Sequence, residues 1–278
     1  MTLEASGPIY AMGRTREETD RLIAQSRLYD TNTRRLLEEA GAGPGMKILD
    51  VGTGAGDIAI MAAEMVGPSG AVVGLDQNPA ILDTARARAS AAGLDNATFI
   101  HGDLQNIALS TDFDIAVGRL VLMYLPDPVA ALKHIASLVK PGGALGFQEI
   151  NLPELRAHYE TSDPWLREMI EWLIETFEIS GADAAQGERL YENFLAAGLE
   201  PASMWSYTPI GGGPGWAGYE YIAATYRSLL PLTEKFGIAT AEQVGVDTLA
   251  QRLRAHVMDK GLPGYLAAHV SAWARKPL

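Results

Sequence analysis

The feature that most constrains this chain is a regular alternation of short apolar runs and helix-forming segments over roughly its first 150 residues. Gly and Pro separate the segments. Buried strands are predicted at 47–51, 71–75, 98–101, 113–117 and 144–148, and helices at 58–66, 79–92 and 129–139. Such alternation is typical of a parallel sheet with helices on both faces and right-handed crossovers. We therefore predict an α/β fold with a doubly wound sheet.

The pattern differs on either side of this region. Residues 15–40 have apolar positions at helical spacing and predict one long helix before the first strand. Beyond residue 150, helices are predicted at 165–179, 189–197, 217–230 and 247–258, and strands at 201–207 and 266–274. We expect an N-terminal helical segment (1–45), a core (46–150), and a last part (151–278) that completes the sheet and carries helical insertions at about 151–185 and 211–262.

Composition excludes several classes of protein. The net charge is −12, and no Lys/Arg run could form a phosphate-binding patch, so nucleic acid and anionic membranes are not expected partners. The chain has no Cys, which excludes zinc ribbons and thiol nucleophiles, and its five His have no ligand-like spacing, so no metal is expected. It has no apolar stretch of membrane-spanning length and no secretory signal, which favours a cytoplasmic location.

A glycine-rich turn joins the first strand to the next helix. Gly52, Gly54 and Gly56 follow Asp50 and Val51. Glycines at this point allow a tight turn and let a ligand lie against bare main chain. Alone, the turn suits a nicotinamide dinucleotide, a flavin or a nucleoside.

Three acidic residues narrow the choice of ligand. Asp50 precedes the glycines, where a carboxylate would disfavour a pyrophosphate but could bind an α-amino group, directly or through water. Asp76 ends the second strand, where a carboxylate can accept both hydroxyls of a ribose. Asp103 follows the third strand and could accept from an adenine amino group, with the Leu104 amide nearby.

These residues occur within a larger set of motifs in order over residues 40–150. The set comprises Ile48 to Ile60, Gly74-Leu75-Asp76-Gln77, Gly102-Asp103-Leu104, the stretch from Gly118 to Pro128, and Leu138 to Gly143. As a set it resembles the class I S-adenosylmethionine (SAM)-dependent methyltransferases. The resemblance implies a seven-stranded, mostly parallel sheet of order 3-2-1-4-5-7-6 with the seventh strand antiparallel.

The resemblance also implies roles for individual residues. Gly52, Thr53 and Gly54 would line the methionine part of SAM, Asp76 would bind the ribose, and Gln77, Asp103 and Leu104 would surround the adenine. Arg119 would lie near the SAM carboxylate. The segment from Tyr10 to Thr15, with Gln25 and Tyr29, and Phe147-Gln148-Glu149 resemble a bacterial branch that includes natural-product methyltransferases. In related enzymes an N-terminal aromatic segment closes over the cofactor, and Tyr10 and Tyr29 are candidates for such a lid.

Acceptor-binding and catalytic candidates come from the later segments. Aromatic residues are concentrated in the two expected insertions, which predicts an aromatic-walled pocket for a planar or largely apolar small molecule. The acceptor-binding candidates are Tyr10, Tyr124, Trp172, Trp216 and Tyr219. Methyl transfer needs a general base only if the acceptor must lose a proton. For that role we name Glu149, at the end of the fifth strand, and His158, with a structural Glu149 and a surface His158 as the simpler interpretations.

The function predicted is therefore SAM-dependent methylation of O, N or C of a small molecule, by a monomer or homodimer. An NAD(P)-dependent oxidoreductase is the second interpretation, because Asp76 suits either cofactor. Asp50, Asp103 and the lack of a Tyr-x-x-x-Lys pair argue against it. A SAM-binding protein without turnover is the third.

Overall fold

The computed structural model describes residues 16–159 and 163–278. Its centre is a seven-stranded sheet of order β3-β2-β1-β4-β5-β9-β6. The strands are β1 (Lys47–Val51), β2 (Ala71–Asp76), β3 (Ala97–His101), β4 (Phe113–Arg119), β5 (Val139–Asn151), β6 (Ser203–Tyr207) and β9 (Ala268–Arg275). Neighbouring strands from β3 to β5 are parallel, whereas β9 is antiparallel to both β5 and β6. This confirms the predicted order and the reversed seventh strand.

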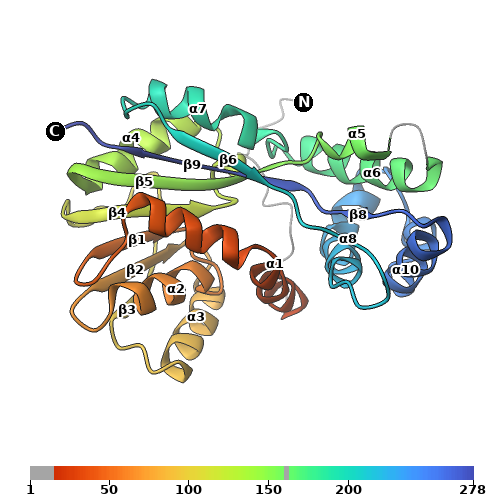
Figure 1. Ribbon diagram of the computed structural model, residues 1–278, viewed down its shortest axis with the longest axis horizontal. Coiled ribbons are helices and arrows are strands. Elements are labelled where there is room, and N and C mark those ends of the chain that lie inside the picture. Colours follow the sequence, from red (N-terminus) through yellow and green to blue (C-terminus); the bar gives the residue numbers. More distant parts are fainter. Residues whose placement is uncertain (1–15, 160–162) are drawn as a thin grey trace, which may run out of the picture.

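Helices cover both faces of the sheet (Figure 1). One face packs against α1 (Arg16–Ala40), α2 (Asp57–Val66) and α3 (Pro79–Ala91) through a core that includes Leu36, Ile58 and Leu82. The other face packs against α4 (Pro128–Leu138) and α7 (Gln186–Ala196), with Ile135 and Phe194 in its core. The doubly wound architecture is thus confirmed.

Local sequence explains where several helices begin. α3, α4 and α6 (Pro164–Ile179) each start with proline at the first helical position. Asn78, Asp127 and Asp163 stand before those prolines, and each side chain accepts a hydrogen bond from a backbone N–H of the first turn. Proline there is pre-organised for the helix, and the cap satisfies an otherwise unpaired donor.

The remaining helices gather beyond one end of the sheet (Figure 1). They are α5 (Leu155–Tyr159), α6, α8 (Gly218–Lys235), α9 (Ala241–Val244) and α10 (Leu249–Lys260). Their apolar faces share a third core that includes Leu166, Ile174 and Leu253. The 3-10 helix η1 (Leu122–Tyr124) and the small pair β7 (Ile210–Gly211) and β8 (Gly264–Tyr265) complete the described elements. This helical group therefore covers the carboxyl ends of the central strands β4 and β5.

Two predicted boundaries were wrong. Strand β5 begins at Val139, because a register shift against β4 carries Pro141-Gly142-Gly143 into the strand, where a turn was expected. Helix α8 continues past Pro231 to Lys235, although proline usually ends a helix, because Leu229 and Thr233 are buried on both sides of that residue. In the described part of the chain, no helix has the length and apolarity needed to span a bilayer.

Candidate active site

The glycine-rich turn lies where β1 ends and α2 begins. Gly52, Gly54 and Gly56 all have positive φ, at 65°, 53° and 84°, and Gly56 is the N-cap of α2. L-residues with a side chain rarely adopt this conformation. A Cβ on Gly52 would also lie only 2.5 Å from a methyl group of Val121. The turn therefore requires glycine, and it presents bare main chain at the carboxyl edge of the sheet.

Asp76 fixes the glycine turn to the end of β2. Its Oδ2 accepts from the Gly54 amide at 2.9 Å, and its Oδ1 accepts from the Asn78 amide at 2.9 Å. Each carboxylate oxygen has a second lone pair, so Asp76 can still accept from two ligand hydroxyls. Gln77 is exposed beside it.

Asp103 shapes the loop after β3. Its carboxylate accepts from the Gln105 amide at 3.0 Å and from the Asn106 side chain at 2.9 Å, and it is exposed. Leu104 is buried. The structure brings Asp50, Asp76 and Asp103 to the carboxyl ends of β1, β2 and β3, which form one edge of the sheet.

Glu149 holds the turn that follows β4. Its side chain is fully buried; Oε1 accepts from the amides of Val121 (2.9 Å) and Leu122 (2.8 Å), and Oε2 accepts from the amide of Met123 (3.3 Å). Burial raises the pKa of Glu149 to about 7, and these hydrogen bonds oppose the rise. Both oxygens are thus committed to main chain. The geometry gives Glu149 an anchoring role at this turn.

Leu120, which begins this turn, has a positive φ of 56°, an uncommon value for a residue with a branched side chain. Its amide donates to the Gln148 carbonyl at 2.8 Å, which ties the turn to β5. Its side chain lines a cavity. An uncommon backbone conformation held in this way places an apolar side chain at the cavity wall.

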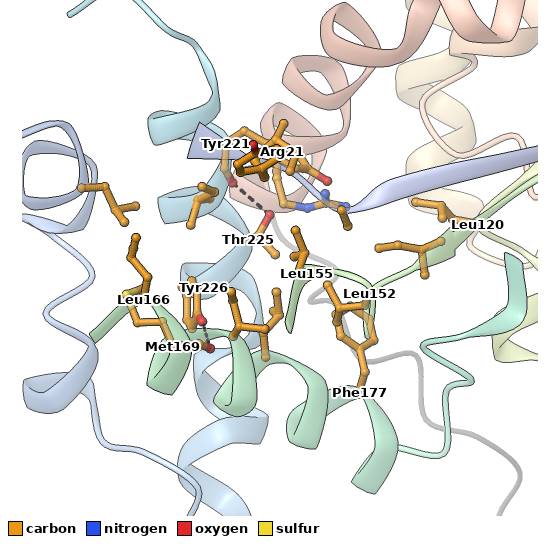
Figure 2. A pocket seen from close by; sticks show the side chains of 18 of the residues that line it. Arg21, Leu120, Leu152, Leu155, Leu166, Met169, Phe177, Tyr221, Thr225 and Tyr226 are labelled. Atoms are coloured by element: carbon orange, nitrogen blue, oxygen red, sulfur yellow. Dashed lines mark hydrogen bonds between the residues drawn. The ribbon is translucent and has the colours of Figure 1, made fainter. Parts of the chain in front are cut away.

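The cavity lies between the sheet edge and the helical group and has a volume of about 110 Å³ (Figure 2). Its walls are almost entirely apolar and aromatic. The lining residues are Arg21, Leu120, Met123, Tyr124, Ile150, Leu152, Leu155, Leu166, Met169, Ile170, Leu173, Phe177, Tyr221, Ile222, Thr225, Tyr226, Leu253, Tyr265, Leu266 and Ala267. Of the predicted acceptor-binding residues, Tyr124 is one of them.

The other predicted acceptor and catalytic residues lie elsewhere. Trp172 is half-buried in the helical core, and Trp216 packs against the glycines of β7 and β8. Tyr219 is buried beneath the guanidinium of Arg254, 5.5 Å from its ring centroid. His158 stacks on Tyr265 at 4.0 Å, behind the cavity wall. Tyr10 lies outside the described residues.

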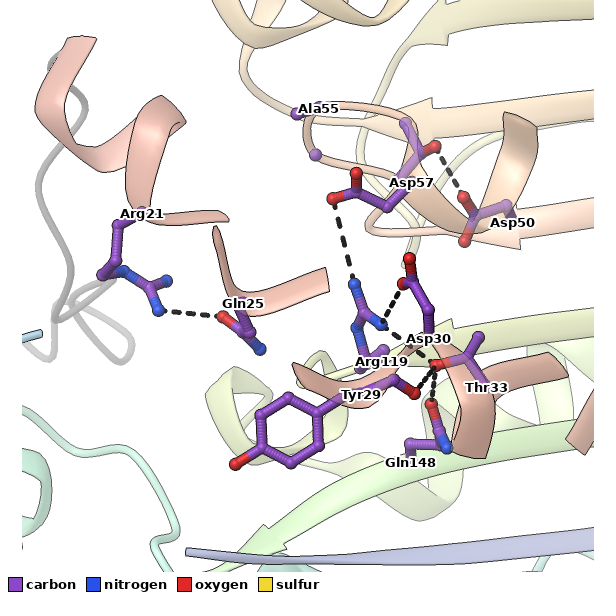
Figure 3. Close-up of polar contacts among 12 residues, drawn as sticks. Arg21, Gln25, Tyr29, Asp30, Thr33, Asp50, Ala55, Asp57, Arg119 and Gln148 are labelled. Atoms are coloured by element: carbon purple, nitrogen blue, oxygen red, sulfur yellow. Dashed lines mark hydrogen bonds and ion pairs between the residues drawn. The ribbon is translucent and has the colours of Figure 1, made fainter. Parts of the chain in front are cut away.

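Arg119 and Asp50 form a buried polar centre behind the glycine turn (Figure 3). The Arg119 side chain is 9% exposed, and its guanidinium nitrogens lie 3.8 Å from Asp57 and 4.0 Å from Asp30. It also donates to the Thr33 hydroxyl at 3.0 Å. Arg119 thus bridges β4, α1 and the first turn of α2.

Asp50 is 1% exposed, and its Oδ2 accepts from the Thr53 hydroxyl at 2.6 Å. Within the described part of the chain its Oδ1 is buried without a hydrogen-bond partner. Burial raises the pKa of Asp50 to about 7, against the effects of the Thr53 hydroxyl and the Arg119 charge. In its charged form this carboxylate places a negative charge close behind the glycine turn, where it would attract a cationic ligand group.

A second buried network, absent from our predictions, fixes α1 on the sheet. Thr33 donates to the Gln148 side chain at 2.6 Å, and both Gln148 and Asn32 donate to Ser271 on β9. Tyr29 stacks on the His269 ring at 3.6 Å. The Tyr29 hydroxyl donates to the Ala267 carbonyl, so this tyrosine is part of the structure behind the cavity wall. Burial raises the pKa of Tyr29 well above its usual value.

This fold and the acids at its strand ends define a Rossmann-like methyltransferase architecture. The family model described as a methyltransferase domain matches residues 42–198, more than half of the chain. The chain therefore belongs to the class I SAM-dependent methyltransferases, as its motifs predicted.

Two curated relatives are methyltransferases of small molecules by name. Aklanonic acid methyltransferase DauC from Streptomyces sp. (strain C5) is 34% identical over 115 residues, which are 41% of this chain and 52% of the relative. Demethylmenaquinone methyltransferase from Staphylococcus aureus (strain JH9) is 32% identical over 123 residues, which are 44% of this chain and 50% of the relative. The chain thus spans about half the length of the curated relatives it matches.

Among solved structures, phosphoethanolamine N-methyltransferase 2 from Haemonchus contortus, in complex with phosphomonomethylethanolamine and S-adenosylhomocysteine, matches with a TM-score of 0.61. The match covers 95% of this chain and 59% of that protein at 17% identity. Agreement at this level of identity concerns the fold.

Proposed function

We propose that this protein transfers the methyl group of SAM to a small, largely apolar and aromatic metabolite. The observation that carries the proposal is the position of the apolar cavity. Leu120 and Ile150, which follow β4 and end β5, form part of its wall. Ligands of open α/β sheets bind outside the carboxyl ends of the strands. Cofactor and acceptor would thus both bind at the carboxyl ends of the strands.

The described residues fit SAM. The turn at Gly52 and Gly54 leaves main chain open to the methionine part, and the carboxylate of Asp50 behind the turn would attract its ammonium group. Asp76 has acceptor capacity for the ribose hydroxyls, and Gln77, Asp103 and Leu104 would surround the adenine. When bound, the cofactor supplies a methyl carbon on a positively charged sulfur. The protein has to align that carbon with the acceptor and exclude water.

The nature of the cavity supports an aromatic or otherwise apolar acceptor. Tyr124, Phe177, Tyr221, Tyr226 and Tyr265 lie among its walls, and aromatic faces also tolerate the cationic character of a sulfonium. The named substrates of the two relatives, aklanonic acid and demethylmenaquinone, are consistent with a small-molecule acceptor here. A role in natural-product biosynthesis is part of this proposal.

The first test is calorimetric titration with SAM, S-adenosylhomocysteine and NAD. The variants are Asp76→Ala and, as a matched control, Asp83→Ala, which alters an exposed carboxylate on α3. We expect both sulfur nucleosides to bind the native protein and the control, with a loss of about 100-fold or more for Asp76→Ala, because two charge-assisted hydrogen bonds disappear. NAD binding in their place would establish the oxidoreductase interpretation. If the sulfur nucleosides bind but no acceptor in a broad panel is methylated, that result would favour a SAM-binding protein without turnover.

A further inference from the structure

The cavity has room for about one aromatic ring. Its volume is about 110 Å³, and aliphatic and aromatic side chains make up most of its walls. A dry apolar cavity of about 150 Å³ in a protein accepts benzene. Because protein interiors are close-packed, a larger molecule would have to displace side chains of the wall. The cavity in this structure therefore suits a single ring with small substituents.

One polar group of the wall differs from the others in its hydrogen bonding. Thr225 donates to the Tyr221 carbonyl at 2.9 Å, and the Tyr226 hydroxyl donates to the Met169 carbonyl. The wall residues that have further partners of their own are Arg21, Tyr124 and Tyr265. The hydroxyl of Tyr221, by contrast, makes no hydrogen bond with any residue in 16–159 or 163–278. It is thus available to a ligand.

Packing fixes the Tyr221 ring at one side of the cavity. The ring meets the Tyr29 ring edge to face, with 6.4 Å between the two centroids, and the Arg21 guanidinium lies 5.9 Å from the Tyr221 centroid. Tyr29 is fixed in turn, since its hydroxyl donates to the carbonyl of Ala267, a residue of the cavity wall. Burial raises the pKa of Tyr29 well above its usual value, and the neighbouring Tyr221 phenol raises it further. The two phenol groups therefore lie close together at this wall.

This side of the cavity lies close to the cofactor edge. Figure 2 shows Tyr221 beside Arg21, at the side formed by α1 and α8, with Phe177 of α6 across the cavity. Leu22, the next residue of α1, lies over the glycine-rich turn, with its Cδ1 3.8 Å from the position that a Cβ on Gly54 would take. A ring substituent bound to Tyr221 would thus lie toward the methyl donor, and the rest of the ring would lie toward α6.

A phenol hydroxyl can donate one hydrogen bond and accept others, so it matches a neutral hydroxyl, amino or carbonyl group. In an apolar wall, a polar group without a partner is costly. Such a site therefore favours a ligand that completes the hydrogen bond over an otherwise equal ligand that lacks the group.

We propose that the acceptor is a single-ring aromatic compound with a neutral hydrogen-bonding substituent, and that the Tyr221 hydroxyl binds this substituent. The apolar walls would hold the ring, and Tyr221 would set which edge of the ring faces the cofactor. The inference rests on the proposed function, and it adds the size class of the acceptor and the residue that orients it.

The test compares ring compounds that differ by one substituent or by one ring. The probes are benzene, phenol, aniline and 2-naphthol, titrated into protein with and without saturating S-adenosylhomocysteine. The main variant is Tyr221→Phe, which removes one oxygen. Tyr191→Phe is the matched control, since Tyr191 is an exposed tyrosine of α7, and Tyr226→Phe removes a cavity hydroxyl that is already bound to main chain. Binding of S-adenosylhomocysteine is measured for every variant.

We expect native protein to bind phenol and aniline more tightly than benzene. Tyr221→Phe should weaken phenol and aniline by about 10-fold and leave benzene within about twofold, because one hydrogen bond is lost. Tyr191→Phe and Tyr226→Phe should keep the native ratio of phenol to benzene affinity. 2-Naphthol should bind no more tightly than phenol, because its second ring exceeds the cavity.

A Tyr221→Phe variant with the native ratio of phenol to benzene affinity would overturn the role of Tyr221. A variant that weakens phenol and benzene alike would do the same, since that pattern marks a purely structural tyrosine. Tighter binding of 2-naphthol than of phenol would overturn the limit of one ring, and failure of every ring to bind a protein that holds S-adenosylhomocysteine would overturn the acceptor class. Ring binding that depends on Tyr221, in a protein that fails to bind S-adenosylhomocysteine, would refute the proposed function and leave the ring site intact.

Discussion

Replacement of Glu149 separates an anchoring role from a catalytic one. The carboxylate accepts from three main-chain amides, of which those of Leu122 and Met123 are buried and that of Val121 is partly buried. In Glu149→Ala all three lose their acceptor. A buried donor left unpaired costs about 1–3 kcal/mol, and because the three share one turn the costs do not add fully, so we expect a loss of about 3–5 kcal/mol.

The Glu149→Gln variant has a different outcome, which depends on pH. Burial raises the pKa of Glu149 to about 7 from an ordinary value of 4.5. The folded state therefore holds this proton where the unfolded state has released it. The resulting stabilisation is complete below about pH 4.5 and is lost as the pH rises through 7, roughly 3 kcal/mol in all. Glutamine does not titrate, but its NH2 group cannot accept from the Met123 amide as Oε2 does. Glu149→Gln should therefore be less stable than the native protein at pH 5, and this difference should become smaller towards pH 8.

The assay is urea unfolding at pH 5 and pH 8, with Glu192→Gln, an exposed glutamate of α7, as the control. Initial rates of methyl transfer are measured on the same samples once an acceptor is known. Native-like stability of Glu149→Ala would refute the anchoring argument. A Glu149→Gln protein of unchanged stability whose kcat falls by about 100-fold or more would identify a general base instead. If native protein and Glu149→Gln differ in unfolding free energy by the same amount at pH 5 and pH 8, burial does not raise the pKa of Glu149 as argued.

Three further changes test the cofactor edge. Burial raises the pKa of Asp50 to about 7, so binding of a cationic cofactor beside it should release a proton near neutral pH. The calorimetric binding enthalpy should then differ between phosphate and Tris buffers. Asp50→Asn should abolish that difference. Gly52→Ala places a Cβ 2.5 Å from Val121 at a positive φ, and it should cost about 1–3 kcal/mol in thermal or urea unfolding. Arg119→Gln leaves the Asp57 carboxylate without one of its cations and should weaken S-adenosylhomocysteine about 10-fold in calorimetric titration. Native-like behaviour of any of these variants would contradict the corresponding contact.

The sheet and its ligand edge could be predicted because the signals are local. Each strand is a short apolar run, and a turn residue or cap follows within a few positions, as with Gly52 after β1 and Asn78 before α3. Once the strands are parallel, their carboxyl ends meet at one edge. The sequence position of Asp50, Asp76 and Asp103 therefore predicted their common location without any knowledge of packing.

The cavity could not be predicted in the same way. Arg21 and Tyr221 are 200 positions apart in the sequence and meet only because α1 packs against α8. Aromatic content indicated the correct helices, but it did not distinguish Tyr226, which faces the cavity, from Tyr219, which is buried beneath Arg254. Which side of a helix meets ligand depends on tertiary contacts.

The turn after β4 connects the two halves of the site. Val121 packs beneath Gly52 of the cofactor turn, whereas Leu120, Met123 and Tyr124 line the cavity. Because Glu149 holds the amides of this turn, a displacement there would move both surfaces at once. A variant that loosens the turn, such as Glu149→Ala, should then weaken binding of the cofactor and of the acceptor together. Glu149 would in this way maintain the alignment that methyl transfer requires.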